Sequence, residues 1–477
     1  MIAGVFALIV LPLVAAGVTF VLRRFQTVTA LLAAGVAGAL GAGALWLPLD
    51  RAIQLGGRQV AMGEPVELLG RQLVLNGADR IGLAFVFLVA GGLFLLGWRA
   101  RPGPMFFALG LALLSLLSAA VVVRPFLYAS LLLTIAAVLA AILVQGGMPG
   151  QTRGALRYLV MMTLALPAFL VAGWLVELYV LNPSDVGLAR NIMVALVAGF
   201  ALLLSVVPFH IWIGPVAQES PPVATVFVLT VYNSVVWFLL LNVLQEYAWL
   251  SARQDVFRIL QLLGLLTAGV GGVLAFSSYD FAHVLAYGVL ADYGCALVAL
   301  GTHTPAGLAA ALLATLARPV SLAILALGIA LARERTKSSE FERLAGLAWS
   351  RPWMAVALVV GGFSLAGIPP LAGFLGRWAQ VRLLATMQPV YAITVLGVTL
   401  GVAAGALRGT DYLLQAPNEA TPDSLSPSKE REAREPRLMI ALIAATLLVG
   451  LILGLFPGVV ESPLRAVVSS FTFFSGQ

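Results

Sequence analysis

The sequence predicts an all-α polytopic membrane protein with about 14 transmembrane helices. Of its 477 residues, 61% are hydrophobic and only 10% are charged, and the mean hydropathy is +1.01. Soluble globular domains carry about 25% charged residues, so an ordinary soluble enzyme is excluded. The 48 glycines and 25 prolines agree with this fold class, because transmembrane helices tolerate both residue types better than soluble helices do.

Each predicted span is an apolar stretch bounded by polar residues, and one bilayer crossing needs about 20 such residues. The predicted spans are 2–22, 28–48, 81–98, 104–123, 125–145, 156–181, 188–207, 221–244, 257–277, 281–301, 306–332, 353–374, 388–408 and 438–457. The connections between them leave no room for a soluble domain.

Two connections are long. Residues 49–80 mix glycine, glutamate and arginine with alternating apolar positions, which is typical of a short external hairpin or loop. Residues 409–437 are rich in proline and serine and then densely charged, which is typical of a flexible cytoplasmic linker. A docking strip for a neighbouring subunit is the alternative for this linker.

The two long connections divide the chain. We expect N-terminal transmembrane helices with an external loop over 1–103, and a C-terminal transmembrane helix and tail over 438–477.

The distribution of basic residues predicts the orientation of the chain. Arginine and lysine are more frequent in the odd-numbered connections, for example Arg23 and Arg24 in the first and Arg99 and Arg101 in the third. The positive-inside rule places such connections in the cytoplasm. We therefore expect a multi-pass protein of a bacterial-type inner (plasma) membrane with both termini outside.

The basic residues are almost all arginine. Of 28 lysines and arginines, only Lys337 and Lys429 are lysine, and both lie in polar connections. Arginine is effectively never deprotonated in proteins. No basic block with interleaved aromatic residues occurs, so we expect no binding of nucleic acid.

The sequence contains no cofactor or metal motif. The single cysteine, Cys295, excludes a disulfide framework, a thiolate metal site and a cysteine-ligated iron–sulfur cluster. No glycine-rich fingerprint follows a strand, so a nicotinamide or flavin site is not expected either. We therefore expect that this chain binds no cofactor and no metal and contributes no catalytic residue.

The first informative polar stretch is 206–233, where prolines and a glycine separate two apolar runs. This pattern predicts a broken helix or a tight re-entrant turn, whose free backbone groups must face protein or water. His210 and Glu219 lie at the break, where a titratable pair could relay protons. The alternative is a structural role, in which they cap and stabilise the turn.

The second stretch is 280–294. His283 and Tyr287 are four residues apart and share a helix face. Asp292 lies nine positions beyond His283, on roughly the opposite face. An aspartate so deep in an apolar run must pair, become protonated or meet water. A place in a proton path and a hydrogen bond between helices are both open for these residues.

The third stretch is 364–378, where a double proline followed by two glycines predicts another interrupted helix. Arg377 lies just past this break, and Arg318 places a second cation in an apolar run. Arg377 is a candidate for a proton path. Glu177 is a further candidate, although a lone acid near the end of a span is more typical of an interface residue.

These motifs together resemble a known family. Pro-Phe-His-x-Trp with a following Ser-Pro-Pro, then Leu-Ala-Tyr-Gly, then Ala-Gly-Ile-Pro-Pro-Leu-Ala-Gly-Phe-Leu-Gly-Arg is similar to the antiporter-like subunits of respiratory complex I, chain N or M type, and to related proton-conducting transporters. The resemblance implies two inverted five-helix repeats with broken helices, at 104–244 and 257–408. It also implies that protons pass along a central polar axis of lysines and glutamates.

The chain departs from this family at the charged positions of that axis. The family's glutamate in the fifth helix falls on Thr134, and two of its lysines fall on Leu203 and Asn233. A third lysine becomes Arg377, and a histidine or glutamine after Leu-Ala-Tyr becomes Asp292. A proton relay needs groups that titrate near neutral pH, and threonine, leucine, asparagine and arginine do not.

Two outcomes follow for proton conduction. Either the pathway is lost, which we favour, or it is rebuilt from His210, Glu219, His283, Asp292 and Glu177. The resemblance implies a membrane-arm subunit of a complex I-like, redox-driven, proton-translocating NADH (or other donor):quinone oxidoreductase, with other membrane subunits as partners and redox centres on other chains. The alternatives are a non-conducting scaffold subunit of such a complex, and a membrane partner in a cation/proton antiporter or an inorganic-carbon uptake complex.

Overall fold

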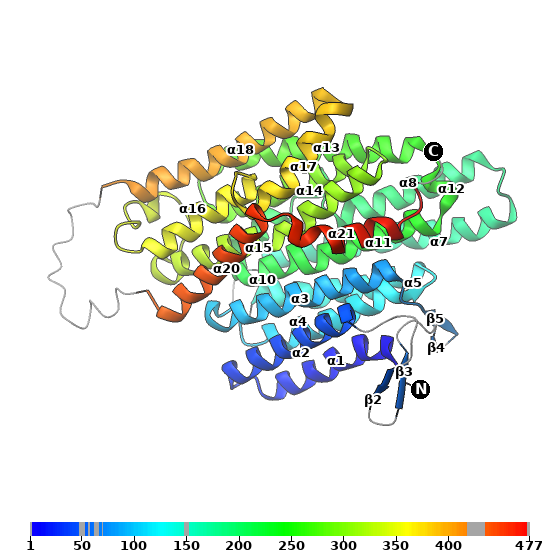
Figure 1. Ribbon diagram of the computed structural model, residues 1–477, viewed down its shortest axis with the longest axis horizontal. Coiled ribbons are helices and arrows are strands. Elements are labelled where there is room, and N and C mark those ends of the chain that lie inside the picture. The colour runs from blue at the N-terminus through cyan, green and yellow to red at the C-terminus, as the bar shows by residue number, and fades with distance from the viewer. Residues whose placement is uncertain are drawn as a thin grey trace. The chain divides into compact units, whose positions relative to one another are not determined.

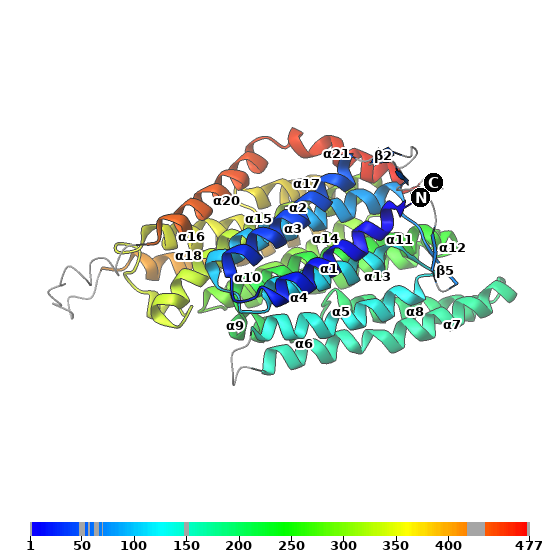
Figure 2. The same cartoon turned by 90° about the horizontal axis from the view of Figure 1, so that it is seen from below.

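The computed structural model is almost entirely helical (Figures 1 and 2). It describes residues 2–46, 53–55, 58–61, 66–68, 70–146, 152–416 and 435–474. Within these ranges, 12 helices are long and apolar enough to cross a membrane, and two shorter apolar helices, Phe106–Val122 and Pro352–Ala366, accompany them. The predicted all-α polytopic membrane fold with about 14 spans is therefore confirmed.

The chain divides into two compact units. Unit 1 comprises Met1–Ser220, Phe227–Arg258 and Arg465–Gln477, and unit 2 comprises Pro221–Val226 and Ile259–Leu464. The inverted relation of the two repeats, and their bounds, stay a prediction.

Several helices of unit 1 pack against one another in pairs. They are α1 (Gly4–Val21), α2 (Gln26–Trp46), α3 (Gly77–Ala100), α4 (Phe106–Val122), α5 (Leu127–Gln145), α6 (Arg153–Thr163), α7 (Ala165–Leu181), α8 (Val186–Leu203), α9 (Ile213–Glu219), the π-helix η1 (Val228–Tyr232), α11 (Asn233–Glu246) and α12 (Ala248–Ser251). Helix α2 lies along α3, α1 along α4, and α7 along α8 (Figure 1).

Unit 2 is centred on one long helix. Its helices are α14 (Phe281–Leu300), α15 (Pro305–Thr336), the short η2 (Glu342–Leu344), α16 (Pro352–Ala366), α17 (Ala372–Met387), α18 (Pro389–Leu414) and α20 (Arg437–Leu455). Helix α15 packs against α14, α16, α17 and α20. Three further helices, α10 (Pro222–Phe227), α13 (Gln254–Phe276) and α21 (Gly458–Ser470), each contribute residues to both units.

Short strands occupy the connection between α2 and α3. Strands β2 (Ile53–Leu55) and β3 (Arg58–Ala61) pair antiparallel, and β1 (Ile2–Ala3) adds to β3 in parallel. Strands β4 (Val66–Leu68) and β5 (Arg71–Leu73) form a second hairpin, which pairs with β6 (Val123–Arg124). The predicted hairpin in 49–80 is thus present as two hairpins. Most of the predicted linker, 417–434, lies outside the described residues.

The predicted helix breaks are present, and several helix boundaries differ from the predicted ones. Helix α8 ends before the 206–233 motif, and the chain continues as the short helices α9 and α10. The predicted span 353–374 instead ends at Ala366, and α17 forms a separate helix after Pro369 and Pro370. Proline interrupts a helix because it lacks the amide hydrogen and its ring meets the preceding turn. Polar side chains such as Arg377 and Gln380 lower the hydropathy of α17, which is why no helix was predicted there.

Glycines allow the helices of unit 2 to approach closely. A Cβ atom at Gly294 on α14 would collide with the backbone nitrogen of Ala268 on α13, and one at Gly271 would lie 2.5 Å from the backbone nitrogen of Ala291. In contrast, a Cβ at Gly269 meets nothing within 4 Å. Small residues at helix contacts are the usual means of packing within a bilayer, because no hydrophobic force drives helices together there.

We predict that Gly294→Ala destabilises the protein by about 1–3 kcal/mol, because the added methyl group forces α13 and α14 apart. Gly269→Ala is the matched control, and there the higher helix propensity of alanine adds up to about 1 kcal/mol. Thermal unfolding of the detergent-purified protein measures both. Equal melting of Gly294→Ala and wild type would contradict the close packing.

Candidate functional site

Asp292, Arg318 and Arg377 form a buried ion triad in unit 2. The Oδ2 atom of Asp292 lies 2.7 Å from Nε of Arg318, and its Oδ1 atom lies 3.8 Å from Nη2 of Arg377. Only 1% of the Arg318 side chain, 5% of Arg377 and 13% of Asp292 is exposed. The Arg318 guanidinium also lies over the ring of Tyr293, 4.5 Å from the ring centre. Each charge in this part of unit 2 therefore has an opposite charge against it.

Helices α14, α15 and α17 each contribute one member of the triad. Helix α17 approaches α15 at Gly376, where a Cβ atom would lie 2.5 Å from Cα of Ala314. The turn between α16 and α17 begins at Gly367, which has φ +86°, and a Cβ there would lie 2.7 Å from Cβ of Arg377. Glycine alone adopts this φ at little cost. The two glycines therefore set the backbone position from which the Arg377 side chain extends.

The triad combines two guanidinium groups with one carboxylate. Because arginine does not release its proton, neither Arg318 nor Arg377 can accept and donate a proton in turn. The Nε and Nη1 atoms of Arg377 and the side-chain amide of Gln380, one turn along α17, have no hydrogen-bond partner among the described residues. Buried polar groups usually bind protein or ordered water, so we expect local water here. The contacts within the triad therefore fix the positions of its three charged side chains.

Two other polar residues of α14, His283 and Tyr287, are not among the described ion-pair partners of the cluster. His283 and Tyr287 share a helix face as predicted, and their rings stack with centres 5.4 Å apart and planes 8° apart. His283 is not one of the residues that pair with Asp292, whose partners are on α15 and α17.

The three positions at which the resemblance implies charged axis residues lie in unit 1 and carry no acid or base. Thr134 donates its hydroxyl to the carbonyl oxygen of Ser130, 2.9 Å away in the same helix. Leu203 and Asn233 are both buried. Threonine, leucine and asparagine do not titrate, so unit 1 offers no proton carrier at these positions.

Glu219 caps a helix. Its Oε2 atom accepts a hydrogen bond from the backbone N–H of Gly154, near the start of α6, at 2.7 Å. A carboxylate is favourable there because it satisfies a free N–H group and faces the positive end of the helix dipole. His210 is half-buried in the connection between α8 and α9. No hydrogen bond or ion pair joins it to Glu219 in the described part of the chain. The geometry matches the structural alternative for Glu219.

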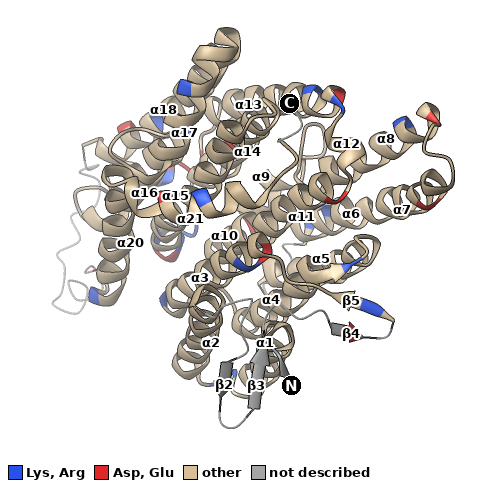
Figure 3. Ribbon diagram, turned by 45° about the vertical axis from the view of Figure 1, so that its right-hand side comes forward, with Lys and Arg blue, Asp and Glu red and all other residues tan. Residues whose placement is uncertain are grey.

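Glu177 is exposed near the end of α7 and lines a small cavity with Arg71. Among the ion pairs of the described residues, two of the six proton-path candidates, Asp292 and Arg377, are in contact with each other, and Arg318 joins them. Charged residues, coloured blue and red in Figure 3, are otherwise sparse along the helices.

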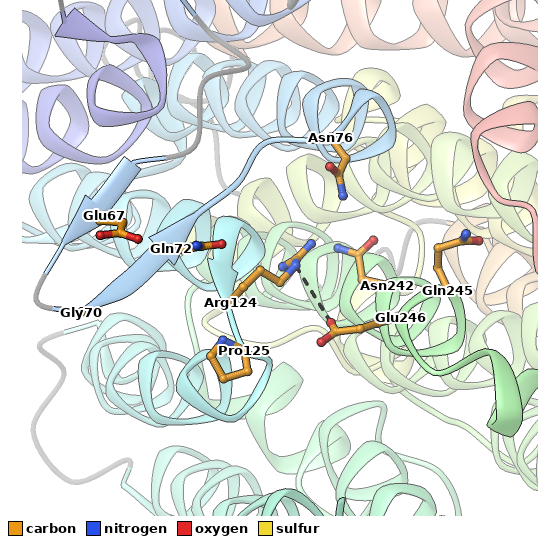
Figure 4. Close-up of a pocket in the computed structure, with 9 residues that line it drawn as sticks. All are labelled: Glu67, Gly70, Gln72, Asn76, Arg124, Pro125, Asn242, Gln245 and Glu246. Atoms are coloured by element: carbon orange, nitrogen blue, oxygen red, sulfur yellow. Dashed lines mark ion pairs between the residues drawn. The ribbon is translucent and has the colours of Figure 1, made fainter. Parts of the chain in front are cut away.

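A second ionic cluster, in unit 1, was not predicted from the sequence. Arg124 Nη2 lies 3.2 Å from Oδ2 of Asp79, and the amide of Asn242 donates to Oδ1 of Asp79 at 2.6 Å. Arg124 Nε lies 4.0 Å from Oε2 of Glu246. The paired side chains of Arg124 and Glu246 line a cavity of about 620 Å³ (Figure 4). Only 1% of the Asp79 side chain is exposed. These contacts tie α3, β6 and α11 together.

Asp79 was missed because the start of its helix was placed too late. Helix α3 begins at Gly77, whereas the sequence predicted a span from residue 81. The acid was therefore assigned to the preceding loop. An aspartate in a first helical turn is favoured by the helix dipole, and this signal could have extended the helix.

We predict that Asp292→Asn destabilises the protein by about 3–5 kcal/mol, because removing one partner of a buried ion pair leaves uncompensated charge. Glu340→Gln is the control, since Glu340 pairs with Arg343 at 3.0 Å on an exposed surface, where such pairs contribute less than about 1 kcal/mol. Thermal and chemical unfolding in detergent measure the two changes. Equal effects of both substitutions would show that the triad is not a buried ionic contact.

Comparison with known sequences identifies a transmembrane domain. Residues 187–403 match the family described as "NADH:quinone oxidoreductase/Mrp antiporter, TM". The chain is 29% identical over 269 residues to NADH-quinone oxidoreductase subunit N of Acidithiobacillus ferrooxidans, a match that covers 56% of this chain and 54% of the relative. It is 29% identical over 294 residues to the Deinococcus radiodurans subunit N, covering 61% and 58%. The match thus spans little more than half the length of these relatives.

Solved structures share the fold over nearly the whole chain. A chain of respiratory complex I from Thermus thermophilus with bound NADH gives a TM-score of 0.72 at 22% identity and covers 98% of this chain and 100% of that one. A chain of the archaeal membrane-bound sulfane sulfur reductase gives 0.80 at 17% identity, covering 99% and 98%. A chain of the Mrp complex from Dietzia gives 0.77 at 18% identity, covering 98% and 52%. Residues 187–403 therefore match the transmembrane domain described for the NADH:quinone oxidoreductase/Mrp antiporter family, and the predicted resemblance to antiporter-like membrane subunits is confirmed.

Proposed function

We propose that this chain is a membrane-arm subunit of a complex I-like, redox-driven oxidoreductase, and that the central polar site of its unit 2 does not relay protons. The similarity to NADH-quinone oxidoreductase subunit N supports the first part. The ion triad of Asp292, Arg318 and Arg377 supports the second part, and it is the observation on which the proposal rests.

The chemistry of the triad does not suit a proton relay. A relay passes a proton through groups that bind and release it at similar free energies. The two guanidinium groups keep their protons, and fixed positive charge raises the energy of any proton that approaches, as arginine does in pores that exclude protons. In unit 1, the corresponding positions are occupied by Thr134, Leu203 and Asn233. The chain then contributes its fold and its packing surfaces to the complex.

The expected surroundings follow from this proposal. The partners are other membrane subunits and the lipid bilayer, and the redox centres lie on other chains, so that this chain itself binds no cofactor. The chain lies in a bacterial-type inner membrane with both termini outside.

A membrane partner in a cation/proton antiporter is the alternative function, which the similarity in fold to the Mrp complex favours. Redox subunits that co-purify with the chain support the first function, and several small antiporter subunits support the second.

The test of non-conduction removes all three charges together. We predict that the triple variant Asp292→Leu, Arg318→Met, Arg377→Met assembles, because replacing a whole buried ionic cluster by apolar residues is often neutral or stabilising. The purified complex is reconstituted into vesicles, and the number of protons moved per electron is measured with a pH-sensitive dye. The proposal expects the same ratio in the variant and in wild type.

A double variant at an exposed ion pair is the matched control for the triple variant. Arg343→Met and Glu340→Leu remove an exposed ion pair of unit 2 and report the effect of lost charge alone. If the triple variant assembles and turns over electrons but moves fewer protons than this control, the triad belongs to a proton path and the proposal is wrong.

A further inference from the structure

A cavity of about 200 Å³ lies among the start of α5, the second half of α7 and the middle of α8 in unit 1. Apolar side chains such as Phe126, Val176 and Leu196 form most of its wall. Arg71 and Glu177 line it as well. The β4–β5 hairpin places Arg71 there, because β5 begins at this residue directly after the turn at Gly70. The cavity thus joins apolar walls with one charge of each sign.

Aromatic rings indicate that this cavity lies at the bilayer surface. The Arg71 guanidinium lies over the ring of Tyr128, 4.0 Å from its centre. The rings of Tyr179, near the end of α7, and Trp249 lie 4.5 Å apart, and Trp174 on α7 is exposed. Tyrosine and tryptophan concentrate where the headgroups of a bilayer meet its hydrocarbon. The cavity is therefore within reach of lipid headgroups.

The polar side chains of the cavity are free to bind a ligand through hydrogen bonds. Among the described residues, neither Arg71 nor Glu177 forms a hydrogen bond or an ion pair, and the hydroxyls of Tyr128 and Tyr247 form none. Burial and the neighbouring Glu246 raise the pKa of Tyr247 to about 12. Its hydroxyl therefore remains a hydrogen-bond donor at neutral pH.

We propose that this cavity binds the headgroup of a phospholipid that carries a primary ammonium, of the phosphatidylethanolamine class. The phosphate receives hydrogen bonds from Arg71 and Tyr247, since guanidinium–phosphate bonds are among the stronger protein hydrogen bonds. The ammonium donates to the carboxylate of Glu177. The acyl chains leave the cavity over the exposed apolar faces of α5 and α7, which include Ile135 and Trp174.

Size and charge select this ligand class. Pockets that enclose a whole small molecule measure roughly 300–1,000 Å³, so a cavity of about 200 Å³ holds a headgroup and leaves the chains outside. An anionic phospholipid without an ammonium would satisfy Arg71 and leave Glu177 beside a phosphate. A choline headgroup has no N–H group to donate to Glu177. Only a zwitterionic headgroup with N–H donors matches both side chains.

Lipid retention tests this proposal on the full chain. The protein, in the assembly in which it purifies, is loaded with ethanolamine, glycerol or choline phospholipids of identical acyl chains, and bound lipid is counted by native mass spectrometry. We expect one retained ethanolamine lipid and at least about tenfold less of the other two. Arg71→Gln and Glu177→Gln each reduce ethanolamine retention by about tenfold or more. Arg343→Gln and Glu340→Gln, an exposed pair outside the cavity, leave it unchanged.

Soluble glycerophosphoethanolamine separates the headgroup from the intact lipid. It carries the same phosphate and ammonium without acyl chains, and we expect it not to displace the retained lipid at equal concentration. Displacement by it would show a site for a free phosphate ester and would overturn the lipid assignment. Equal retention of the three phospholipids by wild type, or unchanged retention in both cavity variants, would overturn the proposal, and the wild-type comparison holds even if a variant folds poorly.

Discussion

A charge inside the hydrocarbon layer is tolerated only where an opposite charge or a hydrogen-bond partner lies against it. In unit 2, this requirement is met by Asp292, which lies between Arg318 and Arg377 on two other helices. The three side chains depend on one another, because loss of the aspartate leaves two buried cations without a counter-charge. The packing of α14, α15 and α17 is therefore coupled to the pairing of these charges.

Close backbone approach makes the triad possible. Gly376 allows α17 to contact α15, and Gly367 turns the chain so that Arg377 enters the space between helices. Unit 1 meets the same requirement differently, since Asp79 pairs with Arg124 and accepts from Asn242. In both units the buried charges hold helices together. The charged side chains of both ion clusters thus contribute to the packing of the helices that carry them.

Much of the fold could be predicted from the sequence, and less of the site. Apolar runs of about 20 residues identified the spans, and proline pairs marked the helix breaks, because both signals are local. Arg318 and Asp292 are 26 positions apart, and no local pattern indicates that they pair. The pairing of Asp79 with Arg124, 45 positions away, likewise leaves no local pattern, and the late placement of the start of α3 assigned Asp79 to a loop. Substitutions at Thr134, Leu203 and Asn233 could be noticed only through the family resemblance, which supplies the positions where titratable groups are expected.

The most direct test of non-conduction is a cryo-electron microscopy structure of the chain within its native complex, at a resolution that shows ordered water. Non-conduction by this site predicts isolated water molecules beside Arg377 and Gln380, and a gap without water on at least one side of Asp292. A continuous chain of water molecules that passes Asp292 and reaches both membrane surfaces would contradict it.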